Sequence, residues 1–287
     1  MHTADGPASL APYLSPNPGQ AFLLPVAETN YLPIRDFNVA DPIVNAKAAS
    51  LFDIRSGRWL YARNIDQKLP IASITKLMTA VVLLENLKLT EVFTVSAENI
   101  NVDGTGADLQ RGEELYGQDL FKIMLIKSSN DAALVLAAEA RKRGVDVIQR
   151  MNEKARELGM LNTSFNDPSG LDDQGSFSTA ADLVKLVSYA SEFEEITDAL
   201  KTPVIDVFSF DGRFSHHLIN TNRLLGQVEG VVFGKTGYTD NALGTMALMV
   251  GVSGGEDRLI SIVLGAHDRF GETSGLINWA KKAYRWR

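Results

Sequence analysis

The most apolar stretch of the chain runs from Pro70 to Leu84, and it carries two polar side chains that are unusual in such a place. A run this apolar predicts a helix that is buried on all sides. Ser73 and Lys76 fall in its first turn, three positions apart, so their side chains share one face. In the simpler interpretation Ser73 caps the helix and Lys76 extends to the surface. A lysine that stays buried must be paired, neutral or chemically active.

Short apolar runs separated by polar turns predict strands near both ends of the chain. Residues 48–54 and 59–62 form one predicted hairpin, and residues 204–210 and 213–219 form another around Asp211-Gly212. Further short runs predict strands at 92–95, 231–233, 246–252 and 259–264. This distribution favours one sheet built from both ends of the chain, with an inserted helical region, over two sequential domains.

Helical periodicity dominates the middle of the chain, in a region from about residue 96 to 200. Helices are predicted at 119–126, 131–143 and 146–158, from Thr179 onward, and at the end of the chain over 276–284. The segments 101–117 and 166–175 are rich in glycine, aspartate and asparagine, and are predicted to be loops.

The first 44 residues differ from the rest of the chain. They hold seven of the ten prolines, a composition that favours an extended arm. Scattered apolar residues indicate that part of this arm lies along the domain formed by residues 45–287. No basic region followed by an apolar core is visible, so we expect a signal or anchor to be absent from this chain.

Composition excludes several classes of function. The net charge of −7 argues against binding to nucleic acid, while contact with a membrane stays open. The absence of cysteine excludes disulfides, a thiol nucleophile and thiolate metal sites. No His-Glu-x-x-His or comparable spacing occurs, and His216, His217 and His267 have no paired motif, so neither a metal nor another cofactor is expected.

Three polar groups interrupt otherwise apolar surroundings: Ser73 with Lys76, Ser128 with Asn130, and Lys235-Thr236-Gly237. Taken alone, the second group reads as a helix cap and the third as a turn before a strand. In this order, however, the three match the Ser-x-x-Lys, Ser-x-Asn and Lys-Thr-Gly set of penicillin-recognising serine enzymes.

With these motifs and their flanks, the chain from about Lys47 to Trp286 resembles the D-alanyl-D-alanine carboxypeptidase family of low-molecular-mass penicillin-binding proteins. The matching segments are Pro70–Ala80, Ile123–Leu136, Arg156–Gly170, Ser178–Asp182, Asn220–Leu225 and Lys235–Asp240. The resemblance implies an α/β (α+β) fold of the β-lactamase/transpeptidase type, with an antiparallel sheet covered by helices. One departure is Ser129, at a position that is often glycine, where a side chain is expected to narrow the cleft or alter substrate preference.

The chemistry of serine acyl transfer explains the first motif. A serine hydroxyl is a poor nucleophile without an adjacent base, and Lys76 can be that base if its amine is neutral. Burial and the second cation, Lys235, are both expected to lower the pKa of Lys76. The amino end of a helix also favours an anion at Ser73.

The resemblance assigns roles to the other motif residues. Ser128 relays a proton to the leaving amine, and Asn130 binds Lys76 and the acyl-side amide. The backbone N–H groups of Ser73 and Tyr238 form an oxyanion hole. The substrate carboxylate is expected to meet Lys235 and Thr236, assisted by Thr221 and Arg223, while Gly237 leaves room for the substrate backbone.

These roles imply a serine D-Ala-D-Ala carboxypeptidase that acts outside the cytoplasmic membrane on peptidoglycan stem peptides and is acylated by β-lactams. A D,D-endopeptidase that cleaves cross-links is the alternative, because some such relatives end soon after the segment that corresponds to 276–286. A β-lactamase and a non-catalytic protein that binds cell-wall peptides are less favoured.

Overall fold

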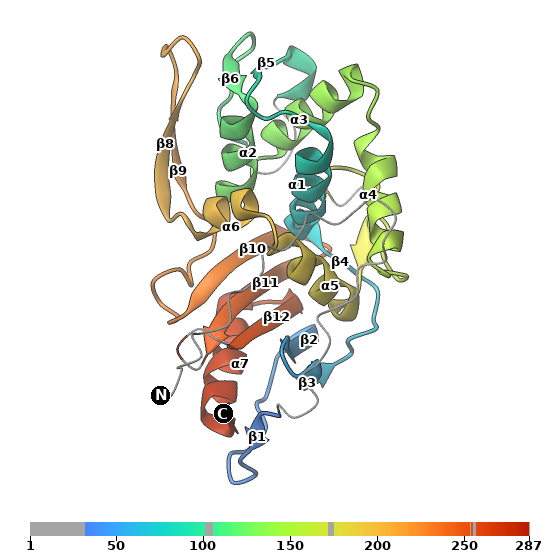
Figure 1. Ribbon diagram of the computed structural model, residues 1–287, viewed down its shortest axis with the longest axis vertical. Coiled ribbons are helices and arrows are strands. Elements are labelled where there is room, and N and C mark those ends of the chain that lie inside the picture. The colour runs from blue at the N-terminus through green and yellow to red at the C-terminus, as the bar shows by residue number, and fades with distance from the viewer. Residues whose placement is uncertain (1–31, 101–105, 172–174, 253, 255–256, 287) are drawn as a thin grey trace, which may run out of the picture.

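A five-stranded antiparallel sheet lies at the centre of the computed structural model, which describes residues 32–100, 106–171, 175–252, 254 and 257–286 (Figure 1). The strand order is β10-β11-β12-β2-β3. The sheet therefore joins an amino-terminal hairpin to three carboxyl-terminal strands, as predicted. The strand bounds are β2 Ala46–Asp53, β3 Arg58–Arg63, β10 Val231–Thr239, β11 Leu243–Val252 and β12 Asp257–Ala266.

Helices cover both faces of this sheet. Alternate side chains point to opposite faces, so Leu51 and Leu248 pack toward α7 (Arg269–Ala283), whereas Phe52 and Met249 join the core on the other side. That second face contacts α5 (Ala180–Ala190). The predicted α+β class, with a helix-covered antiparallel sheet, is confirmed.

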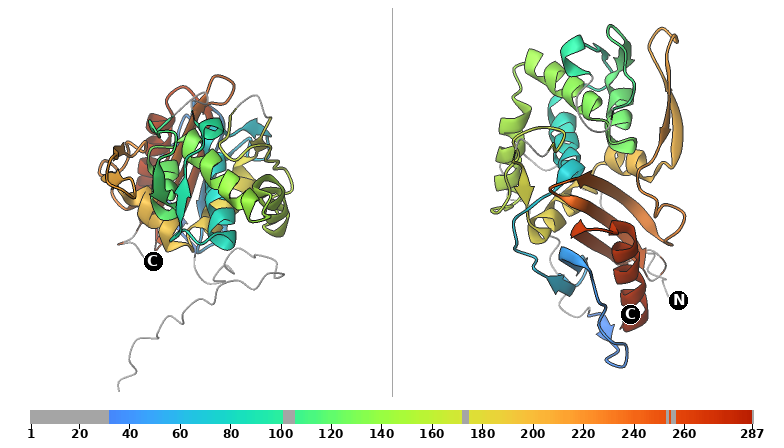
Figure 2. Two further views of the ribbon diagram at one scale, coloured as in Figure 1. Left: turned by 90° about the horizontal axis from the view of Figure 1, so that it is seen from above. Right: turned by 180° about the vertical axis from the view of Figure 1, so that it is seen from behind.

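The remaining helices form a separate layer above the sheet, seen from both sides in Figures 1 and 2. Its central helix α1 (Thr75–Asn86) is buried from Thr75 to Leu83 and is contacted by α2, α3, α4 and α5. The other helices of the layer are α2 Gly117–Ile126, α3 Asn130–Lys142 and α4 Val147–Glu157, while α6 Glu194–Lys201 contacts both α2 and the sheet strand β10. The predicted inserted helical region is thus present, although α6 was not predicted.

Several boundaries differ from the predicted ones. The closing helix begins at Arg269 rather than 276, because Asp268 caps it by accepting a hydrogen bond from the Gly271 N–H. Within the predicted loop 101–117, β6 (Glu114–Tyr116) pairs with β5 (Val92–Thr94). The predicted second hairpin is confirmed as β8 and β9, which extend beside α2 in Figure 1 and span Val204–Phe208 and Ser215–Ile219.

The two ends of the described chain lie together. β1 (Ile34–Arg35) pairs with β13 (Tyr284–Arg285), and the Trp279 indole N–H donates to the Ala40 carbonyl at 2.9 Å. Part of the predicted arm therefore lies along α7, as expected, while residues 1–31 fall outside the described part. Within the described residues, no helix is long and apolar enough to cross a membrane. The short elements are β4 Leu69–Pro70, η1 Ala72–Ile74, η2 Ala97–Asn99 and β7 Phe177–Ser178.

Candidate active site

Ser73 lies in the 3₁₀ turn η1, directly before α1, where it is partly exposed. The preceding Ala72 has a left-handed backbone, with φ of 48°, and Thr245 of β11 donates to the Ile71 carbonyl at 3.1 Å. No side chain caps the start of α1. The simpler interpretation of Ser73 as a helix cap is therefore wrong, and the sheet holds this residue in an unusual turn.

Lys76 is fully buried in the first turn of α1. Its Nζ donates to Ser73 Oγ at 2.9 Å, to Asn130 Oδ1 at 2.7 Å and to the Ser169 carbonyl at 2.7 Å. Burial lowers the pKa of Lys76 to about 7, and the negative charge of Asp167 partly opposes this shift. The surface interpretation of Lys76 is wrong, and with this pKa about half of its amine is neutral near pH 7.

The second motif is held between α2 and α3. Ser128 has a left-handed backbone with φ of 64°, and its Oγ accepts a hydrogen bond from Lys235 Nζ at 2.7 Å. The α3 cap is provided by Ser129, whose hydroxyl accepts from the Ala132 N–H. Ser129 is fully buried, and its expected effect on cleft width or substrate preference stays a prediction. Capping by Ser129 leaves the Ser128 hydroxyl available to Lys235.

The third motif lies on β10, facing the first two. Lys235 is fully buried, and besides Ser128 it donates to the Thr236 carbonyl at 3.1 Å. Its pKa lies well below the usual range because of burial, and also because of the positive charges of Lys76 and Arg269. Burial and the charge of Lys235 were both expected to lower the pKa of Lys76. Burial does lower it, whereas the repulsion between the two lysines lowers the pKa of Lys235 instead.

Gly237 is required by the packing of the protein itself, and its expected role toward the substrate backbone stays a prediction. A Cβ atom at this position would lie 2.9 Å from both the Ser73 nitrogen and the Ala72 Cβ, and 2.5 Å from Thr245 Oγ1. Such contacts are too short for carbon, so only glycine allows η1 to pack on β10. The glycine thus leaves room for the turn that carries Ser73, and the exposed Tyr238 follows it on the strand.

The predicted carboxylate-binding residues are brought together only in part. Thr236 Oγ1 donates to Thr221 Oγ1 at 2.7 Å, so these two hydroxyls are adjacent. Arg223 is exposed and lies over the Phe270 ring, 5.7 Å from its centroid.

One candidate residue was missed from the sequence. Arg269, at the start of α7, lies over the same Phe270 ring as Arg223, and its guanidinium carbon is 4.7 Å from the ring centroid. Its Nε is buried and has no hydrogen-bond partner among the described residues. Burial and Arg223 lower the pKa of Arg269, whose charge in turn acts on Lys235. No motif marks this arginine, because only the folded sheet brings it close to Lys235.

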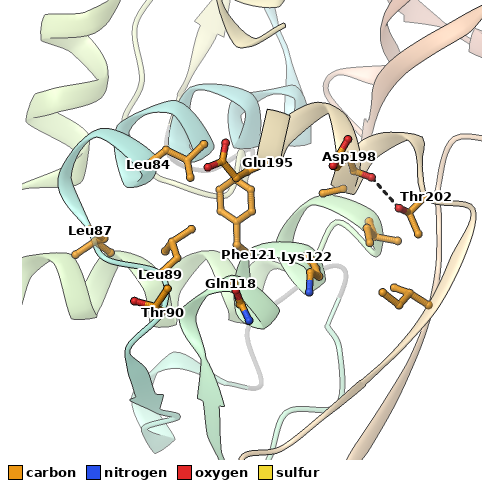
Figure 3. Close-up of a pocket in the computed structure, with 13 residues that line it drawn as sticks. Leu84, Leu87, Leu89, Thr90, Gln118, Phe121, Lys122, Glu195, Asp198 and Thr202 are labelled. Atoms are coloured by element: carbon orange, nitrogen blue, oxygen red, sulfur yellow. Dashed lines mark hydrogen bonds between the residues drawn. The ribbon is translucent and has the colours of Figure 1, made fainter. Parts of the chain in front are cut away.

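Other candidate sites lack this convergence. His216 is buried and bonded to Glu113 at 2.6 Å, whereas His217 points outward to Asp206. The described residues contain no cluster suited to a metal ion. A cavity of about 450 Å³ lies between α1, α2 and α6 (Figure 3), and Leu84, Phe121 and Glu195 are among the side chains around it. None of the three motifs lines this cavity.

Comparison with known proteins agrees with this geometry. The family model described as D-alanyl-D-alanine carboxypeptidase matches residues 35–268. The carboxypeptidase DacF of Bacillus subtilis is 32% identical over 247 residues, which cover 83% of this chain and 63% of that protein. A D-alanyl-D-alanine endopeptidase of Pseudomonas aeruginosa is 30% identical over 253 residues, covering 83% of this chain and 81% of that protein.

Solved structures give the same result. Penicillin-binding protein D2 of Listeria monocytogenes, in an ampicillin-bound form, superposes with a TM-score of 0.73 at 32% identity. The match covers 84% of this chain and 99% of that one. With the family model matching most of its length and the three motifs converging on Ser73, this chain belongs to the D-alanyl-D-alanine carboxypeptidase family.

Proposed function

We propose that the protein is a serine D-Ala-D-Ala carboxypeptidase that removes the terminal D-alanine from peptidoglycan stem peptides. The observation that carries the proposal is the hydrogen bond between the buried Lys76 amine and Ser73 Oγ. A buried amine with a pKa of about 7 is a competent base at neutral pH. The alignment spans 63% of the length of the Bacillus relative, and the activity of that protein supports this one by similarity.

In the acylation step, neutral Lys76 accepts the proton of Ser73, whose Oγ forms a bond to the carbonyl carbon of the penultimate D-alanine. The backbone N–H groups of Ser73 and Tyr238 stabilise the oxyanion. The C–N bond then breaks as Ser128 gives its hydroxyl proton to the leaving D-alanine amine. Ser128 takes up in turn the proton that Lys76 received from Ser73, which leaves Lys76 neutral again. Water next attacks the acyl-enzyme with Lys76 again as base, which releases the shortened peptide and free Ser73.

Cationic and hydroxyl groups on one side of Ser73 suit a substrate that ends in a carboxylate. Lys235, Thr236 and Thr221 form one connected group, and Arg269 and Arg223 add positive charge beside it. Binding a carboxylate there favours the protonated form of Lys235 and so raises its pKa back toward the usual range. On the other side of Ser73, Asn130 holds Lys76 and binds the acyl-side amide.

The same site suits β-lactams, which present a strained amide beside a carboxylate and acylate the serine. Because its substrate lies in the bacterial cell wall, we propose that the protein acts outside the cytoplasmic membrane. A D,D-endopeptidase is the second candidate, since one relative of 30% identity carries that name.

Product analysis tests the proposal and separates the candidates. A stem pentapeptide should lose one D-alanine, faster than a cross-linked peptide dimer is cleaved, and Ser73→Ala should release none. Faster cleavage of the dimer would establish the endopeptidase instead. Rapid turnover of nitrocefin would indicate a β-lactamase, and binding of the pentapeptide without any product would indicate a non-catalytic binding protein.

A further inference from the structure

A tight turn before β7 is organised by one buried carboxylate. Asp167 Oδ1 accepts hydrogen bonds from the Ser169 N–H at 2.6 Å, the Gly170 N–H at 2.7 Å and the Ser169 hydroxyl at 2.6 Å. Its side chain is 7% exposed. These donors, together with the Leu171 N–H at 3.4 Å, bind one oxygen and hold the backbone of residues 167–170 in place.

The same turn contacts the catalytic residues from two directions. The Ser169 carbonyl accepts from Lys76 Nζ at 2.7 Å, and the Pro168 carbonyl accepts from Thr79 Oγ1, one turn further along α1, at 2.7 Å. Gly170 has φ of 85°, and a Cβ atom there would lie 2.0 Å from the Ala72 carbonyl oxygen. The turn therefore rests against both α1 and the residue that precedes Ser73.

We propose that Asp167 is a positioning residue for the reaction: it holds the turn whose Ser169 carbonyl fixes the Lys76 amine, and its negative charge acts on that amine. The inference rests on the proposed function, because it takes Lys76 as the base. The charge of Asp167 raises the pKa of Lys76 against the effect of burial. Asp167 thereby sets the pH above which Ser73 can be deprotonated.

The elements packed around Lys76 carry other polar and charged groups. β10 contributes Lys235, and α3 begins with Asn130 and Asp131. Charged side chains on the helices packed against α1 are engaged in pairs of their own: Lys122 with Asp119, Lys154 with Glu85 and Glu157, and Asp182 with Lys185. Among these groups, Asp167 is the one whose charge raises the pKa of Lys76.

The test is the rate constant for acylation of Ser73 by a fluorescent penicillin, measured from pH 5 to pH 10 on the full chain. Asp167→Asn keeps an oxygen for the donors on Oδ1 but removes the charge. We expect its plateau rate to stay within about threefold of the wild type. The acidic limb of the pH–rate profile is the range in which acylation slows as Lys76 becomes protonated. In Asp167→Asn this limb should move down by about one pH unit, so the variant should acylate up to about tenfold faster than the wild type near pH 5.

Two further variants complete the test. Asp167→Glu keeps the charge but displaces the turn, so its acidic limb should stay in place while its plateau falls. Asp53→Asn, which removes another buried carboxylate that accepts from the Ser56 N–H, should leave the profile unchanged. An acidic limb that stays at the wild-type pH in Asp167→Asn overturns the inference, as does a limb that moves in Asp167→Glu. Failure of the wild type to form any Ser73 adduct overturns the proposed function instead.

Discussion

Ser128 holds its hydroxyl against Lys235 at a conformational cost. A left-handed backbone costs a residue with a side chain about 1–2 kcal/mol relative to the right-handed one. Ser128 adopts it with φ of 64°, and Ala72, next to Ser73, adopts it with φ of 48°. Two strained residues in one site indicate that the surrounding structure imposes their geometry for the reaction.

Paired substitutions of Ser128 separate this strain from its function. Ser128→Ala and Ser128→Gly both lose the hydroxyl, so both should acylate at least about 100-fold more slowly than the wild type. Glycine also relieves the left-handed strain, so Ser128→Gly should be more stable than Ser128→Ala by about 1 kcal/mol. Denaturant unfolding of the two variants measures this difference. Equal stability would show that the backbone at Ser128 is not strained, and wild-type acylation would remove its hydroxyl from the mechanism.

Burial of Lys76 also predicts how stability depends on pH. The pKa of Lys76 is about 7 in the folded protein and returns to its ordinary value near 10.5 on unfolding. Between these values the unfolded state binds more protons, so this residue makes the unfolding free energy rise from pH 7 toward pH 10. In Lys76→Met the rise should be smaller, and unfolding by urea at pH 7 and pH 9.5 measures it. An unchanged rise would contradict a depressed pKa for Lys76.

At the residue scale, sequence motifs identified the side chains that meet at Ser73 but not their backbone partners. Lys76 is hydrogen-bonded to Ser73, as their spacing predicts, and to Asn130, as the resemblance implies. Ser128 is hydrogen-bonded to Lys235, a pairing that was not predicted. The third partner of Lys76 is a backbone carbonyl, which any residue supplies and no sequence pattern can reveal. Arg269 was missed for a related reason, because its position depends on tertiary structure alone.

At the scale of elements, the turn at Gly170 packs so closely against η1 that a methyl group added at Gly170 should destabilise the fold. Gly170→Ala must overcome both a positive φ and a 2.0 Å contact with the Ala72 oxygen, so it should destabilise the fold by about 2–4 kcal/mol and slow acylation. Gly212→Ala is the matched control, since φ there is 72° and no atom lies within 4 Å. It should cost about 1 kcal/mol and leave acylation unchanged.

Thermal or denaturant unfolding of both glycine variants provides the comparison. Equal losses of stability would mean that only backbone conformation matters at Gly170. The turn would then not be held against η1 as the structure indicates.

Element prediction succeeded where periodicity was long and failed where elements were short. α3 and α4 were predicted within one or two residues because their apolar positions recur over three turns. α6 has only eight residues, although Ile196, Ala199 and Leu200 form a buried stripe that marks it. β5 agrees with the strand predicted at 92–95, but its partner β6 and the pair β1–β13 were missed. These strands have two or three residues, which are too short for an alternating pattern.

At the scale of the whole molecule, the first and last segments of the described chain contact each other. Arg35 lies over the rings of Trp279 and Tyr284, at 5.1 and 5.4 Å from their centroids, and donates to the Val39 carbonyl. Val44 is buried in the core beneath α7. We therefore propose that the catalytic domain begins near residue 34 rather than at residue 45.

Substitution of Arg35 tests this boundary. Arg35→Ala should destabilise the fold by about 1–2 kcal/mol, because it removes three cation–π contacts and three hydrogen bonds from a largely buried side chain. Acylation should be unchanged, because Arg35 lies near α7 and away from Ser73. Arg213→Ala, at an exposed hairpin position, is the control and should change stability by less than about 0.5 kcal/mol. If Arg35→Ala were as stable as the wild type, the catalytic domain would begin at residue 45, as the sequence predicts.

The measurement that tests the central claim most directly is mass spectrometry of the intact protein and its peptides after incubation with penicillin. We expect one adduct per chain, located on Ser73, with none in Ser73→Ala and greatly slowed formation in Lys76→Met. An adduct on another residue, an adduct that persists in Ser73→Ala, or no adduct in the wild type would contradict the assignment of Ser73 and Lys76 as nucleophile and base.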